Sequence, residues 1–138
     1  MRLVVQRLYE GELLKERIEQ IVHEHRLTAA TVISAVGSLN TARIRMAGAQ
    51  PNNEDIRSYE GPFEIVSLIG NLGQGRTHLH LAFSDSDGQV IGGHLKEGCI
   101  VHTTVELVLA VEDGLHFSES TDPKTGFGEL HITGGDLP

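Results

Sequence analysis

Residues 77–95 read THLHLAFSDSDGQVIGGHL, and this stretch carries the strongest structural signal in the chain. Its first seven residues alternate, with Leu79, Leu81 and Phe83 on one face of a strand and two histidines on the other. The polar DSDG segment is typical of a hairpin turn, and apolar residues resume at Val90. The stretch therefore predicts two antiparallel strands joined by a tight turn.

The same hairpin is expected to bring three histidines within reach of one another. His78 and His80 lie on one face of the first strand, and His94 lies on the returning strand. With Ser86 near the centre of the turn, His94 comes level with His78 to within about one residue. Imidazole is the commonest protein metal ligand, and three imidazoles leave a coordination position open on zinc. The spacing predicts a divalent metal site, with zinc as the first choice; the alternative is a polar strand face of hydrogen-bonded histidines.

Outward from the hairpin, the chain shows one strand, one helix and then a run of strands. A helix is expected from about residue 12 to residue 26, a polar loop at 50–55, and short additional helical turns elsewhere. The expected strands outside the hairpin cover residues 3–9, 31–36, 42–48, 63–69, 100–111 and 129–132. This order predicts a single α+β domain over residues 1–138, built on a largely antiparallel sheet.

Composition and charge narrow the class of protein. The 19 acidic and 11 basic residues give a net charge of −8, which repels a phosphate backbone. Aromatic residues make up 4% of the chain with no Trp, so few side chains could stack on bases. Both features disfavour an unaided nucleic-acid-binding surface. No apolar run is long enough to span a bilayer and no signal peptide is recognisable, so a cytoplasmic protein without a membrane partner is expected. The single cysteine, Cys99, excludes an intramolecular disulfide and a thiolate metal site.

Two acidic residues within apolar strand segments, Glu64 and Glu106, are candidates for a general base beside the histidines. A buried carboxylate is costly unless it is paired, so an inward one would serve an imidazole or a reaction. The alternative is that both residues lie on a solvated or intersubunit face of the sheet. His102 shares its strand parity with Glu106 and is a further candidate for a fourth metal ligand.

Several motifs, in this order, resemble the plant and prokaryote conserved domain, which also occurs in the AT-hook nuclear-localised proteins. They are GPFEIVSLIG at 61–70, His78-Leu79-His80, Gly92-Gly93-His94-Leu95, Gly98 and Glu106-Leu107-Val108-Leu109, and the likeness extends over nearly the whole chain. The chain is similar to the bacterial stand-alone members of that family. The resemblance implies an α+β fold, a homotrimer and a predicted DNA-binding annotation. It also implies that His78, His80 and His94 form a metal site.

The chain departs from the plant members at two points. It lacks the Arg-Gly-Arg-Pro core of the AT-hook, and Pro62 stands where the plant segment Gly-Arg-Phe-Glu-Ile-Leu has its arginine. Proline removes both a backbone donor and the guanidinium. Direct DNA binding and recruitment of transcription factors are therefore disfavoured. We expect a trimeric metal-binding protein with a regulatory or ligand-binding role and a small ligand at the metal; the alternative is a zinc-dependent enzyme acting on a small substrate.

Overall fold

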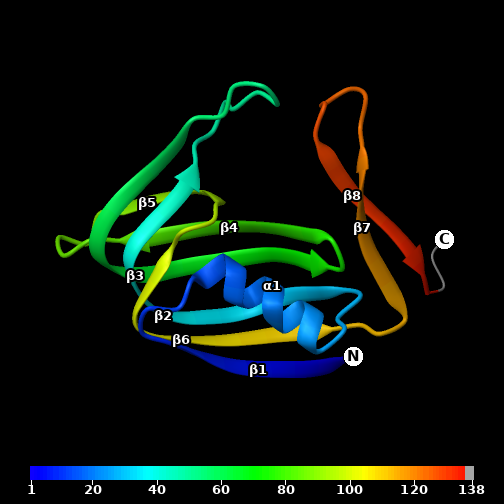
Figure 1. Cartoon of the computed structure of the whole chain (residues 1–138), viewed down its shortest axis with the longest axis horizontal. Coiled ribbons are helices and arrows are strands. Elements are labelled where there is room, and N and C mark those ends of the chain that lie inside the picture. The colour runs from blue at the N-terminus through cyan, green and yellow to red at the C-terminus, as the bar shows by residue number, and fades with distance from the viewer. Residues whose placement is uncertain (136–138) are drawn as a thin grey trace.

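Figure 1 shows the computed structural model, which describes residues 1–135, as a curved antiparallel sheet with one helix lying across it. The helix is α1 (Leu14–Glu24). The strands are β1 (Arg2–Tyr9), β2 (Ala30–Arg45), β3 (Ile56–Gly73), β4 (Arg76–Ser84), β5 (Val90–Leu95), β6 (Ile100–Val111), β7 (Leu115–Thr121) and β8 (Gly128–Gly134). All of the strand pairings among these residues are antiparallel.

The α+β prediction is wrong. The described chain is 64% strand and 8% helical, and no helical turn besides α1 occurs in residues 1–135. The largely antiparallel sheet and the single helix near the N-terminus are as expected. Apart from α1, which connects β1 to β2, the connections between strands are tight turns and loops, in which glycines and short polar segments reverse the chain. The α1 helix has 11 residues, and no helix of the described chain is long and apolar enough to cross a membrane.

Several element boundaries also differ from the sequence prediction, and β3 is longer than the expected strand at 63–69. The helix ends at Glu24, because Arg26 adopts a left-handed φ of 51° and the Leu27 amide turns back to donate to the Val22 carbonyl. The strands expected at 31–36 and 42–48 are one continuous strand, β2, with bulges in its register rather than a break.

The main sheet closes on itself at one end. Its strand order is β1-β6-β2-β3-β4-β5, and β5 also pairs with the far end of β2. Gly93 permits this closure, because a Cβ there would lie 2.5 Å from the carbonyl oxygen of Arg45. As a result the end of β5, which carries His94, lies directly beside Arg45 on β2.

A single hydrophobic core fills the inner side of the curved sheet. Leu14, Ile18, Ile21 and Val22 form the apolar stripe of α1 and are buried against the inward side chains of the strands. Phe83 of β4 is 1% exposed, and its ring lies 4.7 Å from that of Phe63 and 5.6 Å from that of Tyr59, centroid to centroid. The core fixes which face of β4 points inward, so the histidines of β4 point outward.

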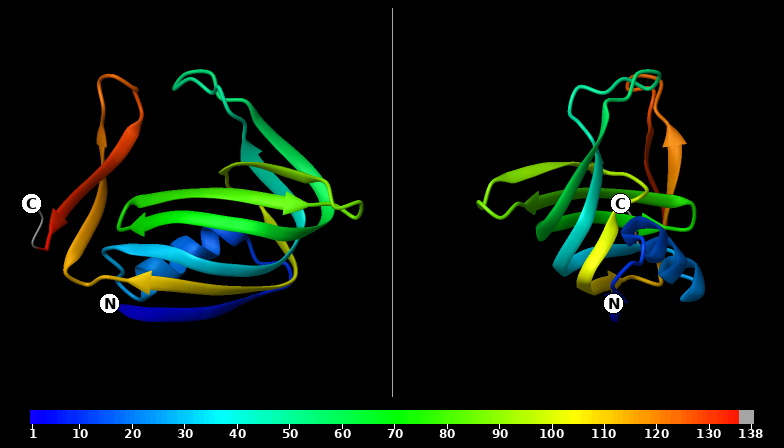
Figure 2. Two further views of the ribbon diagram at one scale, coloured as in Figure 1. Left: turned by 180° about the vertical axis from the view of Figure 1, so that it is seen from behind. Right: turned by 60° about the vertical axis from the view of Figure 1, so that its left-hand side comes forward.

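The strands β7 and β8 form a separate two-stranded ribbon that stands beside the main sheet (Figure 2). The Phe117 amide joins the ribbon to the rest of the molecule by donating to the Thr28 carbonyl at 2.9 Å. An ion pair of 3.1 Å between Arg76 and Glu119 makes a second connection. Within residues 1–135, no residue of this ribbon belongs to the buried core.

Candidate metal centre

His78, His80 and His94 converge on the outer face of strands β4 and β5. His80 pairs directly with His94, and the three ring centroids lie 5.1, 5.2 and 5.7 Å apart. One ring nitrogen from each residue lies within 4.8 Å of the other two. The register differs from the sequence prediction, because the turn is centred on Asp87 rather than Ser86 and His94 therefore lies opposite His80 instead of His78.

The backbone around the histidines is fixed by close packing of β3 against β4. Asn71 pairs with His78, and Ile69 pairs with His80. Between them Gly70 has φ of 142°, and a Cβ at this position would overlap the carbonyl oxygen of His78. A larger residue would push β4 away, so Gly70 holds His78 at its place in the cluster.

The surroundings keep two of the rings neutral. Burial is the main cause that lowers the pKa of His94 to about 4, and the positive charge of Arg45 lowers it further. Burial also lowers the pKa of His78, with additional contributions from His80 and Arg76. A metal ion requires the unprotonated imidazole, so His78 and His94 are in the protonation state that ligation needs at neutral pH.

One atom of the cluster is left without a partner. The Nδ1 atom of His94 is buried and makes no hydrogen bond within residues 1–135. Buried polar atoms are nearly always satisfied, so an orphaned ring nitrogen on one of three converging histidines fits a bound ligand.

The donor set and its spacing fit a divalent ion such as zinc. Nitrogens on a tetrahedral zinc lie about 3.3 Å apart, given Zn–N bonds of about 2.0–2.1 Å. The nitrogens of His78, His80 and His94 lie within 4.8 Å of one another, so small side-chain rotations would bring them to that spacing. These three residues would hold the ion and leave one coordination position open.

Two cavities lie on either side of His94. One has a volume of about 280 Å³ and separates His78 and His94 from the ribbon, which contributes Glu119, Phe127 and Glu129. The other has a volume of about 350 Å³ and lies between the histidines and the loop that follows β2.

Arg45 contributes to the lining of both cavities. Its guanidinium donates to Glu54 at 2.9 Å and lies 5.2 Å from the centre of the Phe127 ring. The open side of the cluster therefore faces an arginine and two ribbon carboxylates, and it has room for a small ligand.

The acidic residues singled out in the sequence lie elsewhere. Glu64 and Glu106 are exposed, and neither lines the cavities beside the histidines. In the sheet Glu106 pairs with Arg7 of β1, and Glu64 pairs with residues of β2 and β4. His102 lies on β6, outside the cluster, with a buried Nδ1 that has no partner in residues 1–135. The roles proposed for these residues stay predictions.

The geometry brings in Glu119 and Glu129, which sequence reasoning missed. Both lie on the ribbon, and their charges act on the pKa of His78. No local pattern in the sequence indicates that this ribbon folds back toward the histidines.

The chain is similar to a known protein family and to segments of longer proteins. The family model described as the Plants and Prokaryotes Conserved (PCC) domain matches residues 1–113. Bifunctional protein GlmU from Synechococcus sp. (strain JA-2-3B'a(2-13)) is 42% identical over 91% of this chain, which corresponds to 19% of that protein. AT-hook motif nuclear-localized protein 10 from Arabidopsis thaliana is 30% identical over 93% of this chain and 37% of its own length. The chain thus spans about a fifth to two fifths of these relatives.

Solved structures with the same fold cover nearly the whole chain. A hypothetical protein from Salmonella enterica aligns with a TM-score of 0.91 and 38% identity over 96% of this chain and 94% of that one. A metal-containing protein from Archaeoglobus fulgidus has a TM-score of 0.80 and 27% identity over 95% and 94%. A candidate DNA-binding protein from Bacteroides thetaiotaomicron has a TM-score of 0.83 over 94% and 91%, and its 17% identity shows the fold alone.

Proposed function

The chain belongs to the Plants and Prokaryotes Conserved domain family, and we propose that it is a trimeric metal-binding member with a regulatory or ligand-binding role. The metal would be a divalent ion, with zinc as the first choice, held by His78, His80 and His94. The observation that carries the proposal is the convergence of three imidazoles, one of which, that of His94, has a buried Nδ1 with no partner in residues 1–135. The similar fold of the metal-containing Archaeoglobus fulgidus protein supports it.

Elemental analysis of protein purified without an affinity tag tests the metal site. We expect close to one divalent ion per chain in the wild type, and close to none in a variant with His78, His80 and His94 all changed to Ala. The matched control changes His116, His131 and His23, which lie outside the cluster, to Ala and should keep its metal. Metal near zero in the wild type, or equal loading in the two triple variants, would contradict the site.

The outer face of the sheet supports assembly of several copies. Val5, Ile33, Val36, Val66 and Ile69 are each between 55% and 64% exposed. Large apolar side chains gathered on one face are typical of a protein contact surface. Because Ile69 pairs with His80, the histidine cluster lies at the margin of this face. We therefore propose that the face is covered by further copies of this chain.

Native mass measurement tests the assembly. A trimer of the 15.0 kDa chain would have three times that mass. Val36→Asp should release monomers, since a charge would be buried in the contact. Thr121→Asp, on the exposed ribbon, is the matched control and should leave the mass unchanged. A monomeric wild type would overturn this part of the proposal.

Direct DNA binding is not part of the proposed function. A net charge of −8 per chain opposes the phosphate backbone, and the sequence has no AT-hook. We expect no salt-dependent mobility shift with duplex DNA at physiological ionic strength. A shift that weakens steeply as salt rises would contradict this expectation.

A second candidate function is hydrolysis or rearrangement of a small substrate, because two carboxylates share the cavity beside His78 and His94. When bound, a divalent ion supplies Lewis-acid chemistry. Glu129 accepts a hydrogen bond from the Thr125 hydroxyl at 2.9 Å, which would orient its carboxylate for holding or moving a proton. Turnover that a chelator abolishes and that Glu129→Gln reduces at least 100-fold, with Glu10→Gln at an exposed position outside the cavity as the control, would favour the enzyme.

A further inference from the structure

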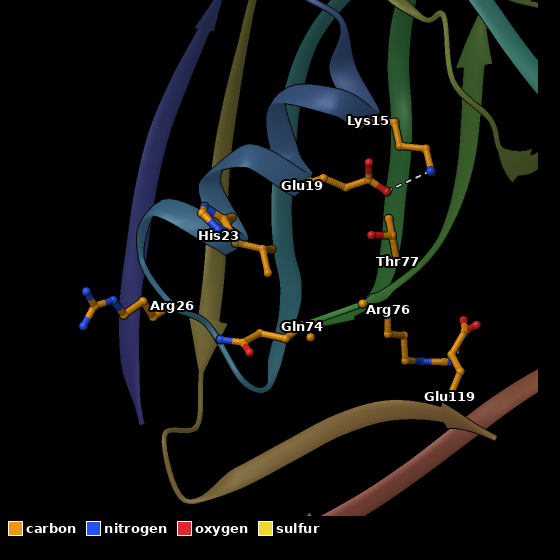
Figure 3. Close-up of a pocket in the computed structure, with 11 residues that line it drawn as sticks. Lys15, Glu19, His23, Arg26, Gln74, Arg76, Thr77 and Glu119 are labelled. Atoms are coloured by element: carbon orange, nitrogen blue, oxygen red, sulfur yellow. Dashed lines mark hydrogen bonds and ion pairs between the residues drawn. The ribbon is translucent and has the colours of Figure 1, made fainter.

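A large groove separates α1 from the turn that joins β3 to β4 (Figure 3). Its volume is about 810 Å³. Lys15 and Glu19 of α1 line one side, Gln74 and Thr77 lie across from them, and the Arg76–Glu119 ion pair closes one end.

Arg76 is the unusual residue of this groove. Its side chain is 2% exposed although it ends in a guanidinium group. The guanidinium donates to Asn71 Oδ1 at 2.8 Å, to Glu119 Oε1 at 3.1 Å and to His78 Nδ1 at 3.1 Å. A buried guanidinium needs an anionic partner, and Glu119 is the anion that supplies it here.

Glu119 is the more replaceable member of the ion pair. Its side chain is 43% exposed and belongs to the ribbon, which lies outside the core. Another oxyanion that reached Arg76 through the groove would keep the guanidinium paired, so the exchange would cost little electrostatic energy. Glu119 also lines the cavity beside His78 and His94, so it has space to move into.

The groove offers further donors to an oxyanion. The side chains of Gln74 and Thr77 make no hydrogen bond within residues 1–135. On the opposite side, the Lys15 ammonium donates to Glu19 at 2.8 Å and to Glu97 at 2.6 Å, and its third N–H can serve a ligand. The charged residues of the lining are Lys15, Arg26, Arg76, Glu19 and Glu119, and Glu97 beside the groove also pairs with Lys15, so these charges balance. An anionic ligand would therefore be attracted by the buried Arg76 guanidinium and not by a positive excess over the whole groove.

We propose that this groove binds a small molecule through a carboxylate or phosphate group, which replaces Glu119 on Arg76 and is also bound by Thr77 and Lys15. The molecule enters between α1 and the β3–β4 turn. Its binding requires no metal.

We expect oxyanion binding in the groove to affect metal binding at the histidine cluster, because Arg76 contacts His78. This linkage rests on the proposed metal site. A neutral imidazole has one lone pair, and a guanidinium can only donate. The bond from Arg76 therefore uses the lone pair that His78 would give to a metal ion. An oxyanion that draws Arg76 toward the groove releases His78, so oxyanion and metal should each strengthen the binding of the other.

Titration of metal-free, ¹⁵N-labelled protein tests the groove itself. The probes are sulfate, which resembles a phosphate group without precipitating zinc, and acetate. We expect saturable amide shifts at residues 73–77 and along α1 with at least one probe, and the stronger probe identifies the chemistry. Arg76→Met should abolish the shifts. Because that variant removes a buried side chain, Thr77→Val provides a milder test and should weaken binding at least fivefold.

Arg57→Met is the matched control, because Arg57 is an exposed cation outside the groove, and it should bind as the wild type does. Shifts that do not saturate, that spread over exposed cations, or that Thr77→Val leaves unchanged would mean an adventitious ion only. Any of these results would overturn the proposal.

Zinc affinity, measured by competition with a chromophoric chelator, tests the linkage. The bound oxyanion should tighten zinc binding several-fold in the wild type. Arg76→Met should bind zinc about tenfold tighter without oxyanion and show no further gain, since it lacks the competing hydrogen bond. Zinc affinity that does not respond to the oxyanion would overturn the linkage. If the wild type binds no zinc but the groove still saturates, the metal-binding function fails while the oxyanion site stands.

Discussion

The body of the molecule, β1–β6 with α1, and the β7–β8 ribbon are stabilised in different ways. Among residues 1–135 every residue of the buried core lies in the body, whereas Leu130 and Ile132 of the ribbon are each 38% exposed. The ribbon nevertheless supplies Glu119, Phe127 and Glu129 to the cavity beside the histidines. The body therefore fixes the positions of the three imidazoles, and the ribbon lines the space through which a ligand would reach them.

The largest difference between the two regions should appear on removing an apolar side chain. Phe83→Ala leaves a void among Phe63 and Tyr59 and should lower the free energy of unfolding by about 3–5 kcal/mol. Ile132→Ala on the ribbon should cost less than about 1 kcal/mol. Urea denaturation of the metal-free proteins measures both. Equal losses would mean that the ribbon is part of the cooperative core.

His94 lines the cavity between the body and the ribbon, and its burial should affect how the stability of the protein depends on pH. His94 has a pKa of about 4 in the folded protein and an ordinary value of 6.5 when unfolded. Between these values the unfolded chain binds a proton that folded His94 does not, so the free energy of unfolding falls as the pH falls through this window. We expect His94 to account for a loss of about 2 kcal/mol, after allowance for screening by solvent.

Urea denaturation of the metal-free protein at several pH values between 7 and 4 measures that loss. His94→Gln should flatten the part of the curve that His94 causes, while His131→Gln on the exposed ribbon should leave it unchanged. A curve that keeps its slope in His94→Gln would show that other groups are responsible.

The body was largely predictable from the sequence, because its signals are local. Alternation along residues 77–83 fixed the inward and outward faces of β4, and the apolar spacing of α1 located the single helix. The α+β assignment was wrong because a strand–helix–strand order does not reveal how little helix a chain contains. The predicted strand partner of His94 was wrong by two residues, because the composition of DSDG does not determine which residue lies at the centre of the turn.

The ribbon and its part of the site were not predictable in this way. β7 was not expected at all, and Glu119 and Glu129 have no local signal for their approach to His78. Arg76 was also missed. It follows a glycine turn and resembles a surface residue in sequence, and only the fold encloses it between Asn71, His78 and Glu119. Contacts between distant segments decide these positions.

The ion pair that joins ribbon and body should contribute a smaller amount. Glu119→Gln keeps an acceptor for Arg76 but removes the charge that balances a buried guanidinium. We expect the free energy of unfolding to fall by about 1 kcal/mol, because the other half of the pair is partly solvated. Ribbon amides should also exchange with solvent faster than in the wild type. Glu129→Gln, which breaks no ion pair within residues 1–135, should change neither the free energy of unfolding nor the exchange rates of the ribbon amides.

The smallest effect is expected where the ribbon tip meets Arg45. The guanidinium lies 5.2 Å from the Phe127 ring centre, and such contacts contribute about 0.5–1 kcal/mol at partly exposed sites. Phe127→Leu keeps an apolar side chain over the cavity and removes the aromatic face, so the loss of stability should stay within that range. Arg45 also donates to Glu54, so it should remain beside His94 in the variant.

What should change in Phe127→Leu is access to the histidines. Exchange of a bound metal with a chelator should become a few-fold faster, because the ribbon tip no longer holds to Arg45, while the equilibrium affinity stays near that of the wild type. Leu130→Ala, on the same ribbon but away from Arg45, is the control and should keep the wild-type rate. An unchanged exchange rate in Phe127→Leu would contradict the view that the ribbon governs access, since its tip would then be released without consequence for the site.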